Sequence, residues 1–396
     1  MRRARFAIAL FLAGPVLAGC ALFGGGDDEE LGPKELVDFE ETLDVERLWS
    51  QKIGDGSKFL RLALQPAGDG NRVYAASRDG NVVAFEPATG RRVWRVETGV
   101  LLSAGPAVGE GRVVVGGSNG DLMALSADDG RELWRVDVDG EILAAPVIRN
   151  DTMVVYTIDG TLRALSLFNG NERWSVEQDL PPLTLRGAAA PVIVGTRVIA
   201  GFDNGRLLAV NLLDGTTEWD VMLSPPSGRS DLERLADVDG TITAVGQDVY
   251  ATGYHGRIAS LAAESGQVLW SRELSTHTGV SADWNNLYTT GDNGEIIALS
   301  RQTGNERWRQ DALLRRSPTL PVPFDTAVVA GDFDGYVHFF NNSDGRMVAR
   351  RRVGKGMISG LPTVIGGVLY VQSESGALAA FAVPQRDTEP PADDES

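Results

Sequence analysis

The stretch Asp79-Gly80-Asn81-Val82-Val83-Ala84-Phe85, which leads through the turn Thr89-Gly90 to Val93-Trp94, is one copy of a unit that recurs along the chain. Each copy consists of a turn dipeptide, a small apolar strand, a second turn and a segment that contains tryptophan. Further copies follow at intervals of 40, 40, 45, 51 and 38 residues, with their tryptophans at Trp134, Trp174, Trp219, Trp270 and Trp308. One more copy, which begins at Asp334-Gly335, has Ala349 in the place of the tryptophan.

A period near 40 residues with Asp-Gly and Asn-Gly turns is typical of four-stranded antiparallel blades, and therefore of a β-propeller. Upstream of the hairpins, small-Pro-apolar segments such as Gly105-Pro106-Ala107-Val108 predict the inner strands, where the blades converge on the axis. We expect each repeat tryptophan to pack between neighbouring blades rather than to stack on a ligand. Trp284 lies outside the repeat, in a predicted strand-connecting turn, and an exposed contact there is the alternative.

The two ends of the repeat region complete one another. Ser375-Gly376-Ala377-Leu378-Ala379-Ala380-Phe381 is a third strand without a fourth, and Val45-Glu46-Arg47-Leu48-Trp49 is a fourth strand without a third. Pairing the two makes an eighth blade and removes free sheet edges. The sequence therefore predicts an all-β fold, an eight-bladed β-propeller over residues 43–383. We expect residues 20–42 to form an acidic flexible tether and residues 384–396 a disordered acidic tail.

The N-terminus carries a targeting signal. Arg2, Arg3 and Arg5 precede a short apolar segment that ends at Leu17-Ala18-Gly19-Cys20, and Cys20 is the only cysteine of the chain. This pattern resembles the bacterial lipobox, so residues 1–19 are expected to be a lipoprotein signal peptide and Cys20 the lipidation site. The alternative is an ordinary secretory signal with a chance cysteine. Under the lipoprotein sorting rule, Ala21 rather than aspartate favours the outer membrane, where we expect the chain to be anchored at the periplasmic face.

Charge and composition exclude several classes of function. The formal net charge is −17, and it becomes −20 once the three arginines of residues 1–19 are removed. Such an acidic chain lacks the basic surface that nucleic acid requires. With one cysteine it forms no internal disulfide. After Cys20 no apolar run is long enough to span a membrane, so the lipid is the expected attachment.

Motifs for catalysis are missing from the sequence. His255, His277 and His338 have no metal-ligand spacing, and we expect His255 and His338 to be structural or solvent-facing. The chain has no Gly-x-Ser-x-Gly elbow, no Walker loop and no dinucleotide fingerprint. The Asp-Gly and Asn-Gly pairs recur once per repeat, so hairpin geometry explains them better than calcium binding does. We therefore expect a protein that is not an enzyme and that has no cofactor or metal site.

The repeat is broken at two places, and these are the candidate binding sites. The interval from Trp174 to Trp219 contains Asp179-Leu180-Pro181-Pro182-Leu183-Thr184-Leu185-Arg186-Gly187, and the interval from Trp219 to Trp270 contains about ten extra residues from Ser224 onwards. Apolar side chains beside charged ones are typical of a partner-binding patch, and loops are where propellers place function. The alternative is that both segments are tolerated insertions.

The repeats resemble the pyrroloquinoline-quinone (PQQ) propeller repeat in hallmarks such as Ala124-Leu125, Thr89-Gly90 and Trp94. That resemblance implies the fold. Quinoprotein dehydrogenases of this fold stack their cofactor on a vicinal disulfide, which a chain with one cysteine cannot form. A PQQ-dependent periplasmic enzyme and a glycan-binding propeller remain the alternative functions.

The lipobox, the eight blades and two loop motifs together resemble the BamB family, the lipoproteins of the outer-membrane β-barrel assembly machine. The motifs are Leu183-Thr184-Leu185-Arg186-Gly187 and Glu233-Arg234-Leu235-Ala236-Asp237-Val238-Asp239. The resemblance implies a non-enzymatic scaffold that binds the periplasmic POTRA domains of BamA and aids the folding and insertion of outer-membrane proteins. It assigns partner binding to Leu183, Leu185, Arg186, Asp237 and Asp239. It leaves open a direct contact with unfolded outer-membrane proteins.

Overall fold

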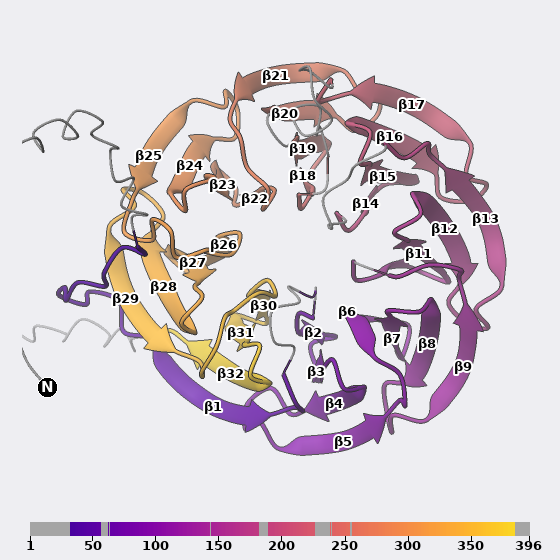
Figure 1. The fold of residues 1–396 in the computed structure, drawn as a ribbon, viewed down its shortest axis with the longest axis horizontal. Coiled ribbons are helices and arrows are strands. Elements are labelled where there is room, and N and C mark those ends of the chain that lie inside the picture. Colours follow the sequence, from indigo (N-terminus) through magenta and orange to yellow (C-terminus); the bar gives the residue numbers. More distant parts are fainter. Residues whose placement is uncertain are drawn as a thin grey trace, which may run out of the picture. The chain divides into compact units, whose positions relative to one another are not determined.

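The alternation of apolar strands and tight turns gives the chain eight four-stranded antiparallel sheets. They are arranged as blades around a ring (Figure 1). The structure, a computed structural model, describes residues 32–56, 62, 64–142, 144–181, 189–225, 238, 240–253 and 256–384. The predicted all-β, eight-bladed propeller is confirmed. Among the described residues, no helix has the length and apolar character needed to cross a membrane.

In every blade the strands are paired in the order inner, second, third, outer. The inner strands are β2 (Ala67–Gly68), β6 (Leu102–Gly109), β10 (Val147–Arg149), β14 (Val192–Val194), β18 (Thr243–Val245), β22 (Ser281–Ala282), β26 (Val322–Phe324) and β30 (Thr363–Ile365). The second strands are β3 (Val73–Ala76), β7 (Arg112–Gly117), β11 (Thr152–Tyr156), β15 (Arg197–Gly201), β19 (Asp248–Thr252), β23 (Asn286–Thr290), β27 (Ala327–Gly331) and β31 (Val368–Gln372). The third strands are β4 (Asn81–Phe85), β8 (Asp121–Ser126), β12 (Thr161–Ser166), β16 (Arg206–Asn211), β20 (Arg257–Ala262), β24 (Ile296–Ser300), β28 (Tyr336–Asn341) and β32 (Ala377–Ala382). The outer strands are β5 (Arg92–Glu97), β9 (Glu132–Asp137), β13 (Glu172–Glu177), β17 (Thr217–Met222), β21 (Val268–Glu273), β25 (Glu306–Gln310), β29 (Met347–Arg352) and β1 (Glu46–Lys52).

The ring closes through its two ends. We number the blades from β2–β5 (blade one) to β30–β32 with β1 (blade eight). Strand β1 pairs antiparallel with β32, with Glu46 opposite Ala382 and Lys52 opposite Ala377. Strands that are more than 300 residues apart in the sequence thus lie side by side in blade eight (Figure 1).

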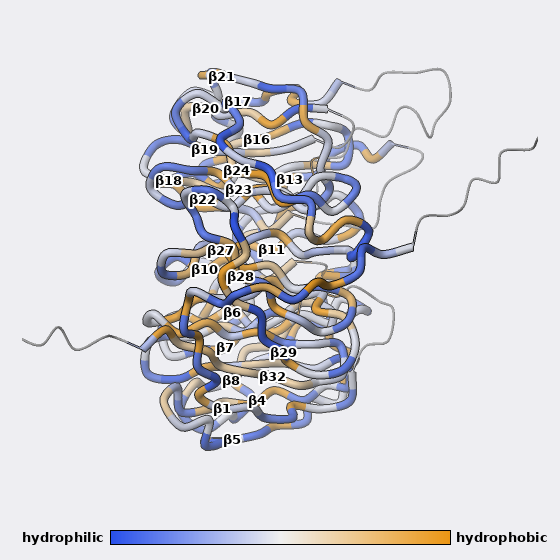
Figure 2. Tube along the Cα trace, turned by 90° about the vertical axis from the view of Figure 1, so that its left-hand side faces the viewer, coloured by the Kyte–Doolittle hydropathy of each residue, from blue (hydrophilic) through white to orange (hydrophobic). Residues whose placement is uncertain are grey.

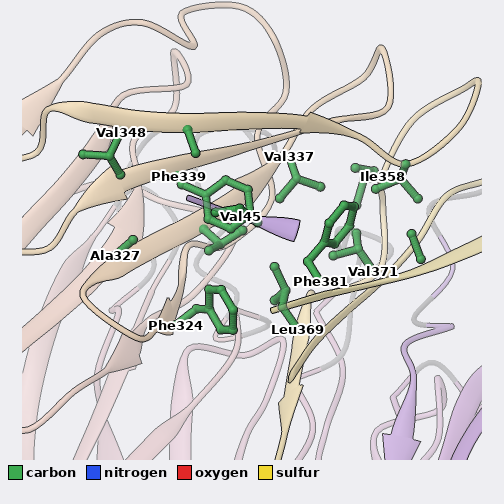
Figure 3. Close-up of a cluster of buried hydrophobic side chains, with 14 residues drawn as sticks. Val45, Phe324, Ala327, Val337, Phe339, Val348, Ile358, Leu369, Val371 and Phe381 are labelled. Carbon is green, nitrogen blue, oxygen red and sulfur yellow. The ribbon is translucent and has the colours of Figure 1, made fainter. Parts of the chain in front are cut away.

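The core lies between the blades. All five residues of β4 are buried, because this strand is covered by a neighbouring blade on each face. In the outer strand β5 burial alternates, and Trp94 is its one fully buried residue. One cluster between blades seven and eight contains Val45, Phe339 and Phe381 (Figure 3). In contrast, the turns near β18 and β22 at one edge of the ring are hydrophilic (Figure 2).

Each repeat tryptophan latches its blade to the next one. Trp94 of blade one is buried, and its Nε1 donates a hydrogen bond of 2.9 Å to the carbonyl of Ala127 in blade two. Its ring lies against Gly130, which has a φ of 76° and where an added Cβ would come within 2.7 Å of Trp94 Cε3. The glycine of the Asp-Gly turn is therefore required both by its backbone conformation and by the close approach of the indole.

The same latch occurs at six other junctions. In each, Nε1 donates to a carbonyl in or beside the hairpin between the third and outer strands of the next blade. The pairs are Trp49 with Pro87, Trp134 with Leu167, Trp174 with Leu212, Trp219 with Ala263, Trp270 with Arg301 and Trp308 with Asn342. The predicted packing of the tryptophans between blades is confirmed.

The eighth junction has no tryptophan, and the topology explains why. Ala349 of blade seven faces blade eight, whose third and outer strands are the two ends of the propeller. Blade eight has no hairpin between these strands, so an indole at position 349 would have no glycine turn to pack against. Ala349 is instead fully buried in the cluster that contains Val45.

Residues 34–42, which the sequence assigned to the flexible tether, lie against blades six and seven. The Lys34 amide donates to the carbonyl of Leu314, and the Thr42 amide donates to that of Val348, both at 3.0 Å. The part of the chain that packs on the propeller thus begins at Lys34 rather than at Leu43. The acidic composition misled the assignment, because Glu41 of this segment forms an ion pair with Arg351 of β29. Residues 20–31 and 385–396 lie outside the described residues.

The tryptophan latch predicts a large loss of stability for one substitution of Trp94 and a smaller loss for another. Trp94→Ala removes a buried aromatic side chain and its hydrogen bond, and we expect it to lower the free energy of unfolding by about 3–5 kcal/mol. Trp94→Phe keeps most of the packing and loses the hydrogen bond, which should cost about 1–2 kcal/mol. Urea denaturation of both variants measures the difference. Equal losses would show that the hydrogen bond, rather than the packed indole, dominates the junction.

Candidate partner-binding face

The long connections between blades all lie on one side of the ring. Strands alternate in direction, so each connection from an outer strand to the next inner strand lies on the same side as the hairpins between second and third strands. We call this side face A. Face B carries the hairpins between third and outer strands, such as the one that contains Gly130. The two expanded connections, residues 178–191 between β13 and β14 and residues 223–242 between β17 and β18, both start and end on face A.

The ends of the two expanded connections meet in one buried cluster. Ala189 closes the first connection, Leu223 and Ile242 border the second, and all three belong to the cluster between blades four and five. Val238, in the middle of the second predicted motif, is fully buried in the same cluster. Its amide donates a hydrogen bond of 3.2 Å to the carbonyl of Phe202. The two connections are therefore anchored next to each other.

The predicted partner-binding residues belong to these two connections but lie outside the described residues. This holds for Leu183, Leu185 and Arg186 of the first connection and for Asp237 and Asp239 of the second. Cys20, the predicted lipidation site, also lies outside the described residues. For the second motif the structure shows Val238 only, and this side chain points into the core. Asp237 and Asp239 directly flank this fixed point.

Two exposed apolar side chains extend the candidate surface. Leu180 begins the first expanded connection and is 41% exposed, and Ile158 in the hairpin between β11 and β12 is 43% exposed. Leu180 lies over Gly160, where an added Cβ would come within 2.9 Å of Leu180 Cδ2. Sequence reasoning missed Ile158. The available signal was an isoleucine before Asp-Gly, where the two preceding repeats have Arg78 and Ser118.

A buried ionic cluster in blade seven was also missed. Asp332 and His338 are fully buried and Arg316 nearly so. Asp332 Oδ2 accepts hydrogen bonds from Arg316 Nε at 2.9 Å and His338 Nε2 at 3.0 Å, while Oδ1 accepts from the amides of Asp334 and Tyr336. Arg316 also forms an ion pair of 2.7 Å with Asp334. Every acceptor position of the Asp332 carboxylate is thus used inside the protein.

This arrangement fixes the charge states of the cluster. Burial lowers the pKa of His338, because the imidazolium would lose its hydration, so the ring is neutral. Burial alone would raise the pKa of Asp332, but the hydrogen bond from His338 and the nearby charge of Arg316 bring the pKa below its usual value. A neutral ring that donates from Nε2 leaves Nδ1 as an acceptor, and Nδ1 has no partner. The cluster is a structural brace for blade seven, since neither His338 nor Asp332 reaches solvent. His255 lies outside the described residues.

One cavity on face A has a lining that includes, among the described residues, neither carboxylates nor Phe, Tyr or Trp rings. This cavity of about 190 Å³ lies between the connections of blades six to eight, and His277, Ser317, Thr319 and Ser359 are among its lining residues. These described lining residues include no carboxylate that could bind calcium and no Phe, Tyr or Trp ring on which a quinone or a sugar could stack. In the described part of the chain no three His, Cys, Asp or Glu side chains are grouped as a metal site would require.

Face B carries a prominent exposed aromatic side chain, Trp284. Trp284 lies in the turn between β22 and β23, as the sequence predicted, and it is 77% exposed. The guanidinium of Arg301 lies 5.2 Å from the centre of its ring. Trp284 is on the opposite face from the expanded connections, and it therefore belongs to a different surface.

The repeat, the ring and its closure define an eight-bladed β-propeller built from PQQ-like repeats. The family model described as "Outer membrane protein assembly factor BamB" matches residues 34–95, 78–310 and 302–388. The curated BamB of Pseudomonas aeruginosa is 42% identical over 376 residues, which cover 95% of this chain and 97% of that protein. BamB of Alkalilimnicola ehrlichii is 44% identical over 383 residues, which cover 96% of this chain and 97% of the relative. The chain therefore belongs to the BamB family of outer membrane protein assembly factors, as the loop motifs and the lipobox suggested.

Solved structures agree with this assignment. The crystal structure of BamB from Moraxella catarrhalis superposes with a TM-score of 0.78 at 27% identity, and covers 86% of this chain and 100% of its own. A quinohemoprotein alcohol dehydrogenase from Comamonas testosteroni superposes with a TM-score of 0.68 at 12% identity, and covers 89% of this chain and 79% of its own. The second likeness shows the fold alone.

The ionic cluster predicts a pH dependence of stability. The pKa of His338 is lowered on folding, so between its ordinary value near 6.5 and its lower folded value the unfolded chain binds more protons. The free energy of unfolding is therefore unaffected by His338 above pH 6.5. Below pH 6.5 it falls with the pH, by at most about 1.4 kcal/mol per pH unit for one proton. His338→Gln should flatten this fall between pH 7 and pH 5, as measured by urea denaturation. Parallel curves for the variant and the wild type would contradict the neutral assignment.

Proposed function

We propose that this chain is a non-enzymatic scaffold of the outer-membrane β-barrel assembly machinery that binds the periplasmic POTRA domains of BamA. In this proposal Cys20 carries the acyl groups that hold the chain at the periplasmic face of the outer membrane. The propeller then serves as a rigid support, and the chemistry of barrel folding and insertion takes place on the partner. Family membership supports the role in assembly, and the geometry of face A supports the choice of surface.

The observation that carries the proposal is the shared anchor of the two expanded connections. Ala189 and Val238 are buried in the same cluster, so two segments that depart from the repeat start from adjacent points on one face. A binding surface built from two loops requires such adjacent attachment points.

The predicted side chains suit a protein partner. Leu183 and Leu185 would bury apolar area, which contributes roughly 25 cal/mol per Å² before the cost of ordering the loop. Arg186 would orient the partner through charge-assisted hydrogen bonds. Asp237 and Asp239 would pair with partner cations or hold Arg186 in place. Leu180 and Ile158, which are exposed beside this segment, would extend the apolar centre of the contact.

A pulldown tests the proposal. The soluble form without residues 1–20 should retain purified BamA POTRA domains, and Leu185→Ala/Arg186→Ala should reduce that retention at least tenfold, because central anchors carry most of the binding energy. Both positions belong to the connection between β13 and β14 and to none of the strands, so circular dichroism and the unfolding midpoint should be unchanged.

Trp284→Ala is the matched control, since it removes a larger exposed side chain on face B. It should bind as the wild type does. Loss of binding in the control alone would move the interface to face B. Failure of the wild type to bind would contradict the scaffold proposal and would lead to a screen for quinone and glycan ligands.

A further inference from the structure

The N-terminal segment Lys34–Val45, which we call the strap, runs along blade seven from its junction with blade six to its junction with blade eight, which lacks a tryptophan. It starts on face A, where the Lys34 amide donates to the carbonyl of Leu314 and the Lys34 ammonium lies 2.8 Å from Asp311. It ends at Val45, which is buried between blades seven and eight just before β1 begins (Figure 3). In Figure 1 the chain before β1 passes beside β29.

The backbone of the strap is held at the place where the outer strand of blade seven is irregular. The register of β29 against β28 shifts at Val348, because Phe340 faces Met347 and Phe339 faces Ala349. The Val348 carbonyl accepts the amides of Thr42 and Leu43 at 3.0 and 3.1 Å. The strap therefore bonds to a carbonyl beside Ala349, the position where the other blades have their tryptophan.

Side chains of the strap complement the charge of β29. The strap and β1 contain several acidic residues, whereas β29 ends in Arg350, Arg351 and Arg352. Arg351 Nη1 lies 2.8 Å from both carboxylate oxygens of Glu41, and its Nε donates to the carbonyl of Val45 at 2.7 Å. The pKa of Glu41 is lowered: partial burial opposes this, but the hydrogen bonds and charges of Arg351 and Arg350 outweigh it.

Apolar and aromatic contacts also hold the strap against the propeller. The guanidinium of Arg350 lies 5.1 Å from the ring centre of Phe39, and Arg350 also donates to the carbonyl of Val37. Leu36 packs on the cluster of blades six and seven, and Leu43 on that of blades seven and eight. The strap does not pack tightly along its whole length: a cavity of about 220 Å³ lies between the strap, the end of β25 and Met347.

We propose that the strap is the eighth latch of the ring: it holds the junction between blades seven and eight in place of the missing tryptophan. Arg316, which braces blade seven from inside, donates to the carbonyl of Lys34 at 3.2 Å and so ties the start of the strap to the buried ionic cluster. The strap begins on face A, the side that carries the two expanded connections.

Backbone hydrogen exchange of the full-length chain tests this inference. The amides of Thr42, Leu43 and Arg350 donate within the latch, so they should be protected in the wild type. In Phe39→Ala/Glu41→Gln we expect them to exchange about tenfold faster, because a bidentate charge-assisted pair and a cation–π contact are lost. Faster exchange should extend to β29 and β1 but not to β17, on the far side of the ring.

Glu40→Gln is the matched control. Glu40 is exposed and adjacent to Glu41, and its replacement by glutamine removes the same charge. This variant should leave every amide exchange rate unchanged. Arg351→Gln, the other half of the ion pair, should reproduce the local increase. Unprotected Thr42 and Leu43 amides in the wild type, unchanged rates in the double variant, or an equal increase in all blades would each overturn the proposal.

Discussion

The contact between an indole and the hairpin of the next blade is the interaction on which the rest of this ring depends. A blade of four strands has two apolar faces and cannot bury either one alone, so each blade is stable only between neighbours. The tryptophan combines a large apolar ring with one donor, and a glycine turn provides both the space for the ring and a carbonyl for Nε1. The latch recurs at each junction that has a hairpin. One tryptophan and one glycine turn per blade therefore account both for the repeat in the sequence and for the packing of successive blades in the ring.

This constraint also determines where variation is tolerated. The hairpins between third and outer strands are fixed on face B, because they form the latches. The connections between blades lie on face A and take no part in the latches, so they can lengthen without opening the ring. Both expanded connections start and end on face A, and Val238 and Ala189 show how an expanded segment is still tied to the core. A ring with two adjacent expanded connections is consistent with the scaffold role proposed above.

Most of the fold was predictable from the sequence, because the features that specify it are local. The turn dipeptides, the strand pattern and the spacing of the tryptophans predicted the blades. The position of Trp49, in register with the other tryptophans, predicted that β1 closes the ring. Three features were not predictable for a common reason. The ionic partner of His338 comes from outside β28, exposure of Ile158 depends on the path of residues 178–181, and the strap contacts β29 more than 300 residues away in the sequence. The candidate loop residues came from the broken period and the family resemblance, and their side chains lie outside the described residues.

The central claim is that face A presents its two expanded connections as one binding surface, and a double-mutant cycle tests it most directly. Isothermal titration with BamA POTRA domains would compare the wild type with Leu185→Ala, Asp237→Ala and the double variant. One shared surface predicts that each single variant weakens binding by about 1 kcal/mol or more. It also predicts that the loss of binding free energy in the double variant differs from the sum of the losses in the two single variants by at least about 0.5 kcal/mol. Strictly additive losses, or one connection without effect on affinity, would contradict a single surface.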